Sequence, residues 1–340
     1  MKAVTTILML TFSSICFGQS AIKAILDSVI VKARQTSMYS SSVNWDSLQK
    51  AIYVKAENAK TIQELKPAFT TLINGMLDKH GMVRDAKNYS VIAYFTDFSK
   101  LNHSDKRTRE REISKMVYDT SVHQFEYKLL KGKIGYLKLV TIGPSVDAEK
   151  EAKRIRSAVI ELSKSKINGW IIDLRYNGGG NMNPMVSGIA PIIGDGKVGS
   201  LRNLTGEKLF DWYIKSSNFI YAGYQAVTLP NEPIFKKHSK VAVLTSRWTI
   251  SSGEIVATCF KGRPNTKFFG EMTGGYTTNN NWEIVDNQVI LTISTGIFSD
   301  RNGVTYGYNI PVDVEIPFEI VEDFEKDKCI IEASKWLRSE

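Results

Sequence analysis

The chain has 340 residues, of which 43% are hydrophobic and 23% are charged, and its formal net charge at pH 7 is +9. A chain of this length and composition can bury a substantial core, as one large domain or two, so disorder is not the default expectation. The positive charge would suit nucleic acid or an anionic surface, but the basic residues are scattered. The densest basic group, residues 106–112, alternates with acids and lacks aromatic residues for base stacking. We therefore predict a solvated surface segment there and no nucleic-acid partner.

The amino terminus has the pattern of an export signal. Lys2 precedes an uncharged run over residues 3–17, and the small residues Cys16 and Gly18 occupy the two recognition positions, third and first, before a predicted cut ahead of Gln19. The run is too short for a membrane span, and no later run reaches the roughly 20 apolar residues that spanning requires. We predict that residues 1–18 are a signal peptide and that the protein is exported, to the periplasm or outside the cell. A lipid anchor on Cys16 is a minor alternative, because the residue before it is bulky.

Two cysteines follow the predicted cut, Cys259 and Cys329. They could pair in an oxidising compartment, but Cys259 falls in a predicted helix and is equally suited to be a buried small hydrophobe. No Cys-x-x-Cys or Cys/His cluster is present, so a structural zinc site is not expected.

Helical periodicity dominates residues 21–76. Apolar residues recur at steps of three and four, with helix starts predicted near Trp45 and Thr61. The pattern ends in the sequence Leu-Asp-Lys-His-Gly at residues 77–81, where Gly81 is suited to stop a helix. This part of the chain is predicted to be a small helical module.

The segment after this module has a weaker signal. Residues 90–95 predict a strand, and the charged segment that follows is either a loop or an exposed helix. No internal repeat or low-complexity linker is present, and the best boundary lies near residues 125–128. We therefore assign residues 19–127 to the helical amino-terminal module with its linker.

An alternating α/β series follows the boundary. Residues 134–139 predict a strand, residues 147–165 an amphipathic helix, and residues 170–174 a buried strand. A strand, helix and strand in this order predict a crossover connection into a mostly parallel sheet. The fold class is therefore α/β, or α+β overall. A helical module precedes an α/β core over residues 128–340 with a central mixed, partly parallel sheet.

The remaining elements of the core have shorter signals. The sequence predicts a helix over residues 185–193, an irregular stretch over 203–235, strands over 267–269, 289–293 and 312–316, and a last helix over 330–337.

The stretch over residues 240–254 carries the clearest chemical signal. Its β-branched residues 241–244 predict a buried strand, a polar loop follows, and apolar periodicity from Ile255 predicts a helix. Ser251 and Ser252 lie where that helix begins, so either hydroxyl would stand beside unpaired N–H groups that can stabilise an oxyanion. From this stretch alone, an N-cap role is the commoner outcome for such a serine.

A glycine triplet follows the strand at residues 170–174. The loop reads Arg-Tyr-Asn-Gly-Gly-Gly over residues 175–180. Neither a Gly-x-Gly-x-x-Gly helix entry nor a Gly-Lys-Ser/Thr ending is present, so nucleotide binding is weakly supported. The same loop could offer N–H groups to a carbonyl oxygen, which is what acyl transfer requires.

Three motifs together resemble a known family. The sequence WIIDLRYNGGG at 170–180, the segment 249–254 and the segment 270–275 resemble the core of the carboxy-terminal processing peptidase and tricorn protease group, the S41 serine peptidases, with a ClpP/crotonase-like fold. In the family pattern the nucleophile stands three residues before the glutamate, which selects Ser251. The resemblance implies that the amides of Ser252 and of Gly178 or Gly179 hold the oxyanion. It also implies that no metal or nucleotide cofactor is needed.

The candidate general base differs from that of one branch of the family and matches that of the other branch. The processing peptidases have a lysine at the position of Tyr276, and a tyrosine with a pKa of about 10 is a poor base at neutral pH. The tricorn branch uses a histidine contributed by the segment before the core, and His80 matches that placement. The other histidines, His103, His123 and His238, lie in polar or basic surroundings. The resemblance therefore implies His80 as the general base.

The residue that would orient His80 stays open. Lys79 stands where the tricorn branch has a serine, and no carboxylate occupies the position of that branch's glutamate. Asp78 is close in sequence, but only geometry can decide its role. Without an orienting group the imidazole can hold the wrong tautomer, which lowers activity severely in other triads.

The resemblance implies an exported serine-type peptidase that hydrolyses peptide bonds of a peptide or protein substrate through an acyl-enzyme. The chain has no insert large enough for a PDZ module between residues 83 and 128. A second interpretation is a degenerate, non-catalytic S41-like module that binds a hydrophobic ligand or peptide. The sequence leaves the cleavage preference and the oligomeric state open.

Overall fold

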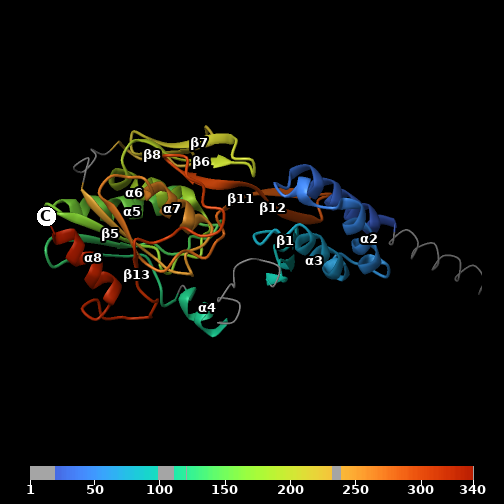
Figure 1. The fold of residues 1–340 in the computed structure, drawn as a ribbon, viewed down its shortest axis with the longest axis horizontal. Coiled ribbons are helices and arrows are strands. Elements are labelled where there is room, and N and C mark those ends of the chain that lie inside the picture. The colour runs from blue at the N-terminus through green and yellow to red at the C-terminus, as the bar shows by residue number, and fades with distance from the viewer. Residues whose placement is uncertain (1–19, 99–110, 120, 232–238, 340) are drawn as a thin grey trace, which may run out of the picture. The chain divides into compact units, whose positions relative to one another are not determined.

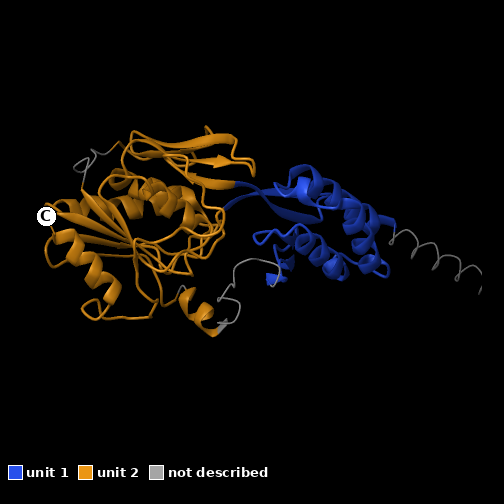
Figure 2. Cartoon of the chain, viewed as in Figure 1, with its two compact units in different colours: residues 1–104, 278–296 blue, residues 105–277, 297–340 orange. Residues whose placement is uncertain are grey.

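The computed structural model describes residues 20–98, 111–119, 121–231 and 239–339. The predicted signal peptide, His103 and His238 lie outside these residues. The chain divides into two compact units, shown in Figure 2. The first unit contains residues 1–104 and 278–296, and the second contains residues 105–277 and 297–340. The first unit thus takes a segment from late in the chain, for which the sequence carries no boundary signal.

The first unit begins with helices. Residues 20–36 are helical, and α2 (Trp45–Ala56) and α3 (Lys66–Gly75) follow, with short 3₁₀ turns η1 (Ser40–Ser42) and η2 (Gln63–Leu65) before them. Asn44 caps α2 by accepting from the Ser47 amide, and a proline stands in the first turn of α3. The buried faces of these helices share one core with residues of the unit's strands. The predicted helical module is present in this part of the chain.

Four strand segments complete the first unit: β1 (Met82–Asp85), β2 (Val91–Tyr94), β11 (Thr278–Val285) and the first part of β12 (Val289–Asp300). β1 lies between β2 and β12 and is antiparallel to both, with Met82 opposite Thr292 and Tyr94. β11 pairs with β12. Pairing therefore brings the segment around residue 80 next to residues that are about two hundred positions away in sequence.

The second unit is built on a six-stranded sheet in the order β13-β10-β9-β5-β4-β3. Its strands are β3 (Glu126–Leu130), β4 (Ile134–Lys138), β5 (Gly169–Asp173), β9 (Lys240–Thr245), β10 (Thr266–Gly270) and β13 (Val314–Glu315). Every neighbouring pair is parallel except β3 and β4. The predicted mixed, partly parallel sheet is confirmed.

Helices cover both faces of this sheet (Figure 1). The larger core contains buried residues of α5 (Ala148–Ser163), α6 (Met182–Ile193) and α7 (Ser252–Phe260), and the smaller one those of α8 (Lys328–Arg338). Successive strand residues alternate between the two cores: Trp170 and Ile172 of β5 face the larger core, and Ile171 faces the smaller. Because both faces are covered, the central strands β5 and β9 are almost continuously buried and apolar. The unit also contains the short helix α4 (Arg111–Val117).

The expectation of an irregular stretch over residues 203–235 is wrong for residues 208–221, which form two strands, whereas residues 222–231 have no helix or strand. β6 (Gly196–Arg202), β7 (Lys208–Lys215) and β8 (Asn218–Tyr221) form an antiparallel series that continues from the end of β12. β7 buries Trp212 and Ile214 and exposes Tyr213. Its charged and half-exposed residues interrupt the apolar run, so the sequence pattern is weak although the strand is regular.

Cys259 and Cys329, the cysteines within the described ranges, are buried and form no disulfide there. Cys259 belongs to the larger core and Cys329 to the smaller, so each acts as a small hydrophobe. Of the helices within the described ranges, none combines the length and apolar character needed to cross a bilayer.

Candidate active site

Ser251 stands at the N-cap position of α7 with a backbone that is unusual for a capping residue. Its φ is 54° and its ψ is −120°. These are the angles of the first central residue of a type II′ turn, and the Gly253 amide closes that turn on the Ile250 carbonyl at 2.9 Å. The position ordinarily takes glycine, so an L-residue there carries strain of about 1–3 kcal/mol. An ordinary N-cap serine has an extended backbone, so capping alone does not account for this conformation.

Glu254, one turn into α7, holds this strained serine turn in place. It is fully buried, and its carboxylate accepts from the amides of Ser251 at 2.9 Å, Gly275 at 2.9 Å and Tyr276 at 2.8 Å, and from the Thr273 hydroxyl at 2.5 Å. Burial raises the pKa of Glu254, and these hydrogen bonds oppose that rise. The carboxylate thus joins the start of α7 to the segment after β10. The Ser-x-x-Glu spacing of Ser251 and Glu254 is that of a capping box, and this is the one local signal in the sequence for the role of Glu254.

The glycine loop packs directly against the serine turn. The Ile250 amide donates to the Asn177 carbonyl at 3.0 Å, and the Ser252 hydroxyl donates to the Gly180 carbonyl at 2.6 Å. Gly179 has a φ of 94°, and a Cβ placed on it would lie 2.8 Å from Ser251 Cβ and 3.1 Å from the Ser252 nitrogen. Only glycine allows this approach. The two motifs that the sequence analysis connected are therefore in contact within one unit.

The three amides expected to hold an oxyanion differ in what they already bind. The Gly178 amide donates to Thr141 Oγ1 and the Gly179 amide to Asn177 Oδ1, both at 2.9 Å. The Ser252 amide, in the first turn of α7, has no acceptor among the residues that the structure describes. It lies at the end of the helix where the helix dipole favours negative charge.

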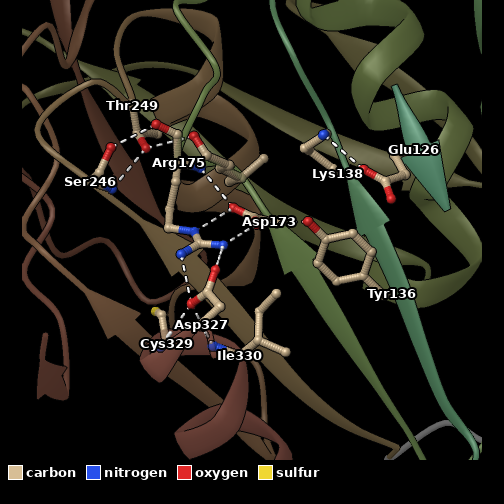
Figure 3. Close-up of polar contacts among 11 residues, drawn as sticks. Glu126, Tyr136, Lys138, Asp173, Arg175, Ser246, Thr249, Asp327, Cys329 and Ile330 are labelled. Atoms are coloured by element: carbon tan, nitrogen blue, oxygen red, sulfur yellow. Dashed lines mark hydrogen bonds and ion pairs between the residues drawn. The ribbon is translucent and has the colours of Figure 1, made fainter. Parts of the chain in front are cut away.

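A buried ion-pair network anchors the glycine loop at its base, as Figure 3 shows. The Arg175 guanidinium donates to Asp173 at 2.7 Å and to Asp327 at 2.8 Å, and Tyr136 donates to Asp173 at 2.9 Å. Burial alone would raise the pKa of Asp173, but the neighbouring guanidinium holds that pKa below its ordinary value. Ser246, just after β9, donates through its hydroxyl to the Arg175 carbonyl at 2.7 Å. The network thus fixes the glycine loop to the serine strand and, through Asp327, to the N-terminus of α8.

A cavity of about 260 Å³ borders the same loop. It is lined by Phe125, residues 139–143, Val146, Glu151, Arg154 and Ile155. One lining residue, Thr141, is the acceptor of the Gly178 amide, and another, Ile142, pairs with Gly180 in a parallel bridge. The cavity therefore lies beside the oxyanion candidates.

His80 belongs to the first unit, where it follows α3. Its Nδ1 lies 3.0 Å from Thr278 Oγ1, and its amide donates to the Asp78 carboxylate at 3.1 Å. The other described histidine, His123, belongs to the second unit and stacks on Tyr176 with ring centroids 4.2 Å apart. Burial lowers the pKa of His123.

Comparison with known proteins identifies the family. The family model described as Peptidase family S41 matches residues 133–316, which is more than half of the chain. The chain belongs to peptidase family S41.

Relatives of this S41 chain extend over most of its length. The nisin-resistance protein of Lactococcus lactis subsp. lactis is 26% identical over 315 residues, covering 90% of this chain and 84% of that protein. A lipoprotein from Streptococcus agalactiae has a similar structure, with a TM-score of 0.66, 24% identity and coverage of 94% and 96%. The photosystem II D1 C-terminal processing protease gives a TM-score of 0.56 at 14% identity, with coverage of 89% and 95%. These structural likenesses show an S41 peptidase fold in this chain.

Proposed function

We propose that this S41 chain is a serine-type peptidase that hydrolyses peptide bonds through an acyl-enzyme on Ser251. The main observation in support of this proposal is the backbone of Ser251, which has the positive φ of a turn position that ordinarily takes glycine. Glu254 holds this turn at the start of a buried helix. Strain of this kind gathers at functional sites, where it presents a side chain that an ordinary helix start would not. The family membership supports the same chemistry.

The proposed mechanism divides hydrolysis into two steps. Ser251 Oγ attacks the peptide carbonyl while His80, the general base, takes its proton and then gives it to the leaving amine. Water, deprotonated by the same imidazole, then attacks the ester and releases the acid and the serine. The negative oxygen formed in each step is stabilised by the Ser252 amide and the N-terminus of α7. The amides of Gly178 and Gly179 are secondary in this proposal, because each already has an acceptor.

Ser251, and not Ser252, is the proposed nucleophile for a structural reason. The Ser252 side chain is buried and its hydroxyl is engaged with the Gly180 carbonyl at 2.6 Å. Ser252 therefore serves the site through its backbone and by tying down the glycine loop.

Substrate binding is proposed at the cavity beside the glycine loop. Its volume of about 260 Å³ suits one or two side chains of an extended peptide. Because the Lactococcus lactis relative is named for nisin resistance, nisin belongs in the first panel of substrates tested. We further propose that the protein acts after export, which the signal-like amino terminus supports.

A non-catalytic role is the alternative that specific observations favour. Tyr276 occupies the position of the lysine base of the processing peptidases, and both candidate glycine amides are already bound. A degenerate module of this kind would bind a peptide or hydrophobic ligand in the cavity without cleaving it.

Labelling with a fluorophosphonate probe separates the two functions. We expect the wild type to be labelled, Ser251→Ala to lose labelling, and His80→Ala to lose at least a hundredfold in labelling rate. His123→Ala is the matched control, because it removes the other described histidine and should label at the wild-type rate. A folded wild type that resists the probe, or labelling that persists in Ser251→Ala, would refute the peptidase proposal.

A further inference from the structure

Four polar residues of the first unit form a continuous chain of hydrogen bonds that ends on His80. His80 Nδ1 lies 3.0 Å from Thr278 Oγ1, which lies 3.0 Å from Ser294 Oγ, which lies 2.6 Å from an oxygen of Asp78. Thr278 is 8% exposed, and Ser294 and Asp78 are fully buried. The residues come from the loop after α3, from β11 and from β12. Thr278 and Ser294 do not occupy the positions of the tricorn branch's serine and glutamate, and Asp78 is related to His80 only by its proximity in sequence.

The carboxylate of Asp78 acts as an acceptor in this arrangement. One of its oxygens accepts from the His80 amide at 3.1 Å and the other from the Ser294 amide at 2.8 Å. Backbone amides can only donate, so each oxygen of Asp78 acts as the acceptor of an amide hydrogen bond. Burial raises the pKa of Asp78, while the donors from Ser294 and His80 oppose that rise by stabilising the charged form.

The direction of each bond follows from counting protons. Each hydroxyl has one proton, and that of Ser294 is given to Asp78, since otherwise two lone pairs would meet at 2.6 Å. Ser294 must then accept from Thr278, and Thr278 must accept from His80. The proton of a neutral His80 imidazole is therefore on Nδ1, and the lone pair is on Nε2. The reverse order would leave a buried oxygen of Asp78 without its hydroxyl donor, which is costly.

We propose that Thr278, Ser294 and Asp78 are positioning residues that hold His80 in the Nδ1-protonated tautomer, with Nε2 as its basic nitrogen. Two hydroxyl groups thus transmit the effect of a buried carboxylate that does not itself touch the imidazole. The catalytic consequence rests on the proposed function, in which His80 is the general base. A general base needs a defined tautomer, and loss of it costs about four orders of magnitude in a directly bonded triad.

The tautomer can be measured without any reaction. Nitrogen-15 NMR of the uniformly labelled full chain distinguishes Nδ1–H from Nε2–H, and His80→Ala identifies the His80 signals. We expect Nδ1–H in the wild type at neutral to mildly alkaline pH. Thr278→Val removes one hydroxyl without changing the side-chain shape, and we expect it to convert His80 to Nε2–H or to a mixture of tautomers.

Thr292→Val is the matched control. Thr292 is on β12 two residues before Ser294, is 3% exposed, and has a hydroxyl with no hydrogen-bond partner among the residues that the structure describes. The control should keep the Nδ1–H tautomer. A wild-type His80 with Nε2–H, or a Thr278→Val variant that keeps the wild-type tautomer, would overturn the inference.

The same variants separate this inference from the peptidase proposal. If the wild type reacts with the fluorophosphonate, Thr278→Val should react at least tenfold more slowly and Thr292→Val at the wild-type rate. Equal rates for Thr278→Val and wild type would overturn the catalytic part of the inference. If the wild type does not react, the peptidase proposal fails, while the NMR result still decides whether the hydroxyl chain fixes the tautomer.

Discussion

At the residue scale, backbone conformation distinguishes Ser251 from the other helix-capping residues of its unit. Asp147, Asn181 and Asp327 have φ between −61° and −90°, and their side chains accept from amides of the first helical turn. Ser251 has a φ of 54° at the same helical position. A residue whose purpose is capping does not need this conformation. The difference gives a physical reason to treat Ser251 separately from an ordinary cap.

The strain at Ser251 predicts that replacement by glycine and replacement by alanine have different effects on the free energy of unfolding. Ser251→Gly removes the steric conflict at positive φ, whereas Ser251→Ala retains it. We expect the glycine variant to be more stable than the alanine variant by about 1 kcal/mol in urea unfolding, and both to lose fluorophosphonate labelling. A glycine variant that is less stable than the alanine variant would show that the turn is not strained.

The buried carboxylate of Glu254 allows a second prediction at the residue scale, for the variant Glu254→Gln. Its two oxygens accept four donors, so the amide group of Glu254→Gln must face at least one N–H or O–H donor. We expect a loss of about 1–3 kcal/mol in the free energy of unfolding, and slower labelling because the serine turn loosens. Glu332→Gln on α8, whose side chain is 45% exposed, is the control and should change little. Unchanged unfolding and labelling in Glu254→Gln would contradict the role assigned to this carboxylate.

At the element scale, the site depends on two loops that follow neighbouring parallel strands. β5 and β9 are paired, and the glycine loop after β5 meets the serine turn after β9. Parallel strands bring their carboxyl ends to one edge of the sheet, where such loops commonly form sites. The close approach at Gly179 leaves no room for a side chain. The close spacing between the glycine loop and the serine turn can therefore be tested by adding a side chain at Gly179.

Gly179→Ala tests this spacing against a matched glycine. Gly194 has a φ of 92°, close to the 94° of Gly179, but a Cβ placed on it meets nothing within 4 Å. Alanine strains the backbone at either site by about 1–3 kcal/mol, so only Gly179→Ala adds a clash with Ser251. We expect Gly179→Ala to lose more stability than Gly194→Ala and to lose labelling. Equal losses in the two variants would show that the loop is free to move away.

At the scale of the whole molecule, remote segments are joined by charge as well as by apolar burial. Arg175 connects the end of β5 to Asp327, the N-cap of α8, 152 positions later in the sequence. The two carboxylates and the guanidinium are at most 5% exposed in their side chains. Removing the cation would leave two buried carboxylates that lack a counter-charge, which costs far more than losing a surface pair.

We expect Arg175→Met to lower the free energy of unfolding by about 3–5 kcal/mol at neutral pH. The pKa of Asp173 is lower in the folded protein than the value of about 4 expected in the unfolded chain. The ionised Asp173 carboxylate therefore contributes stability at pH values above its unfolded pKa, and this contribution is lost as the pH falls through its folded pKa. The difference between wild type and variant should therefore shrink below about pH 4. Lys335→Met, which breaks the exposed pair with Glu332, should change little at any pH. A deficit that is constant across pH, or absent, would contradict this account.

The sequence by itself determined the elements of the sheet core and the serine motif. Continuous apolar runs predict β5 and β9, and the predicted helix over residues 147–165 is α5, capped by Asp147. These features depend on residues within a few positions of one another, which periodicity can detect. The pattern failed for β7, where one face is exposed and charged residues divide the apolar run.

Only the tertiary structure decided which residues form hydrogen bonds around Ser251 and His80. Thr278 and Ser294 carry no local signal, and their hydrogen bonds to His80 and Asp78 join positions 198 and 216 apart. Likewise, the bonds of Glu254 to Thr273, Gly275 and Tyr276 depend on where a later loop lies. Strand pairing sets these neighbours, and pairing is settled by burial over a whole unit. Local sequence can therefore suggest a candidate nucleophile, whereas the groups that position it and the proposed base require the folded chain.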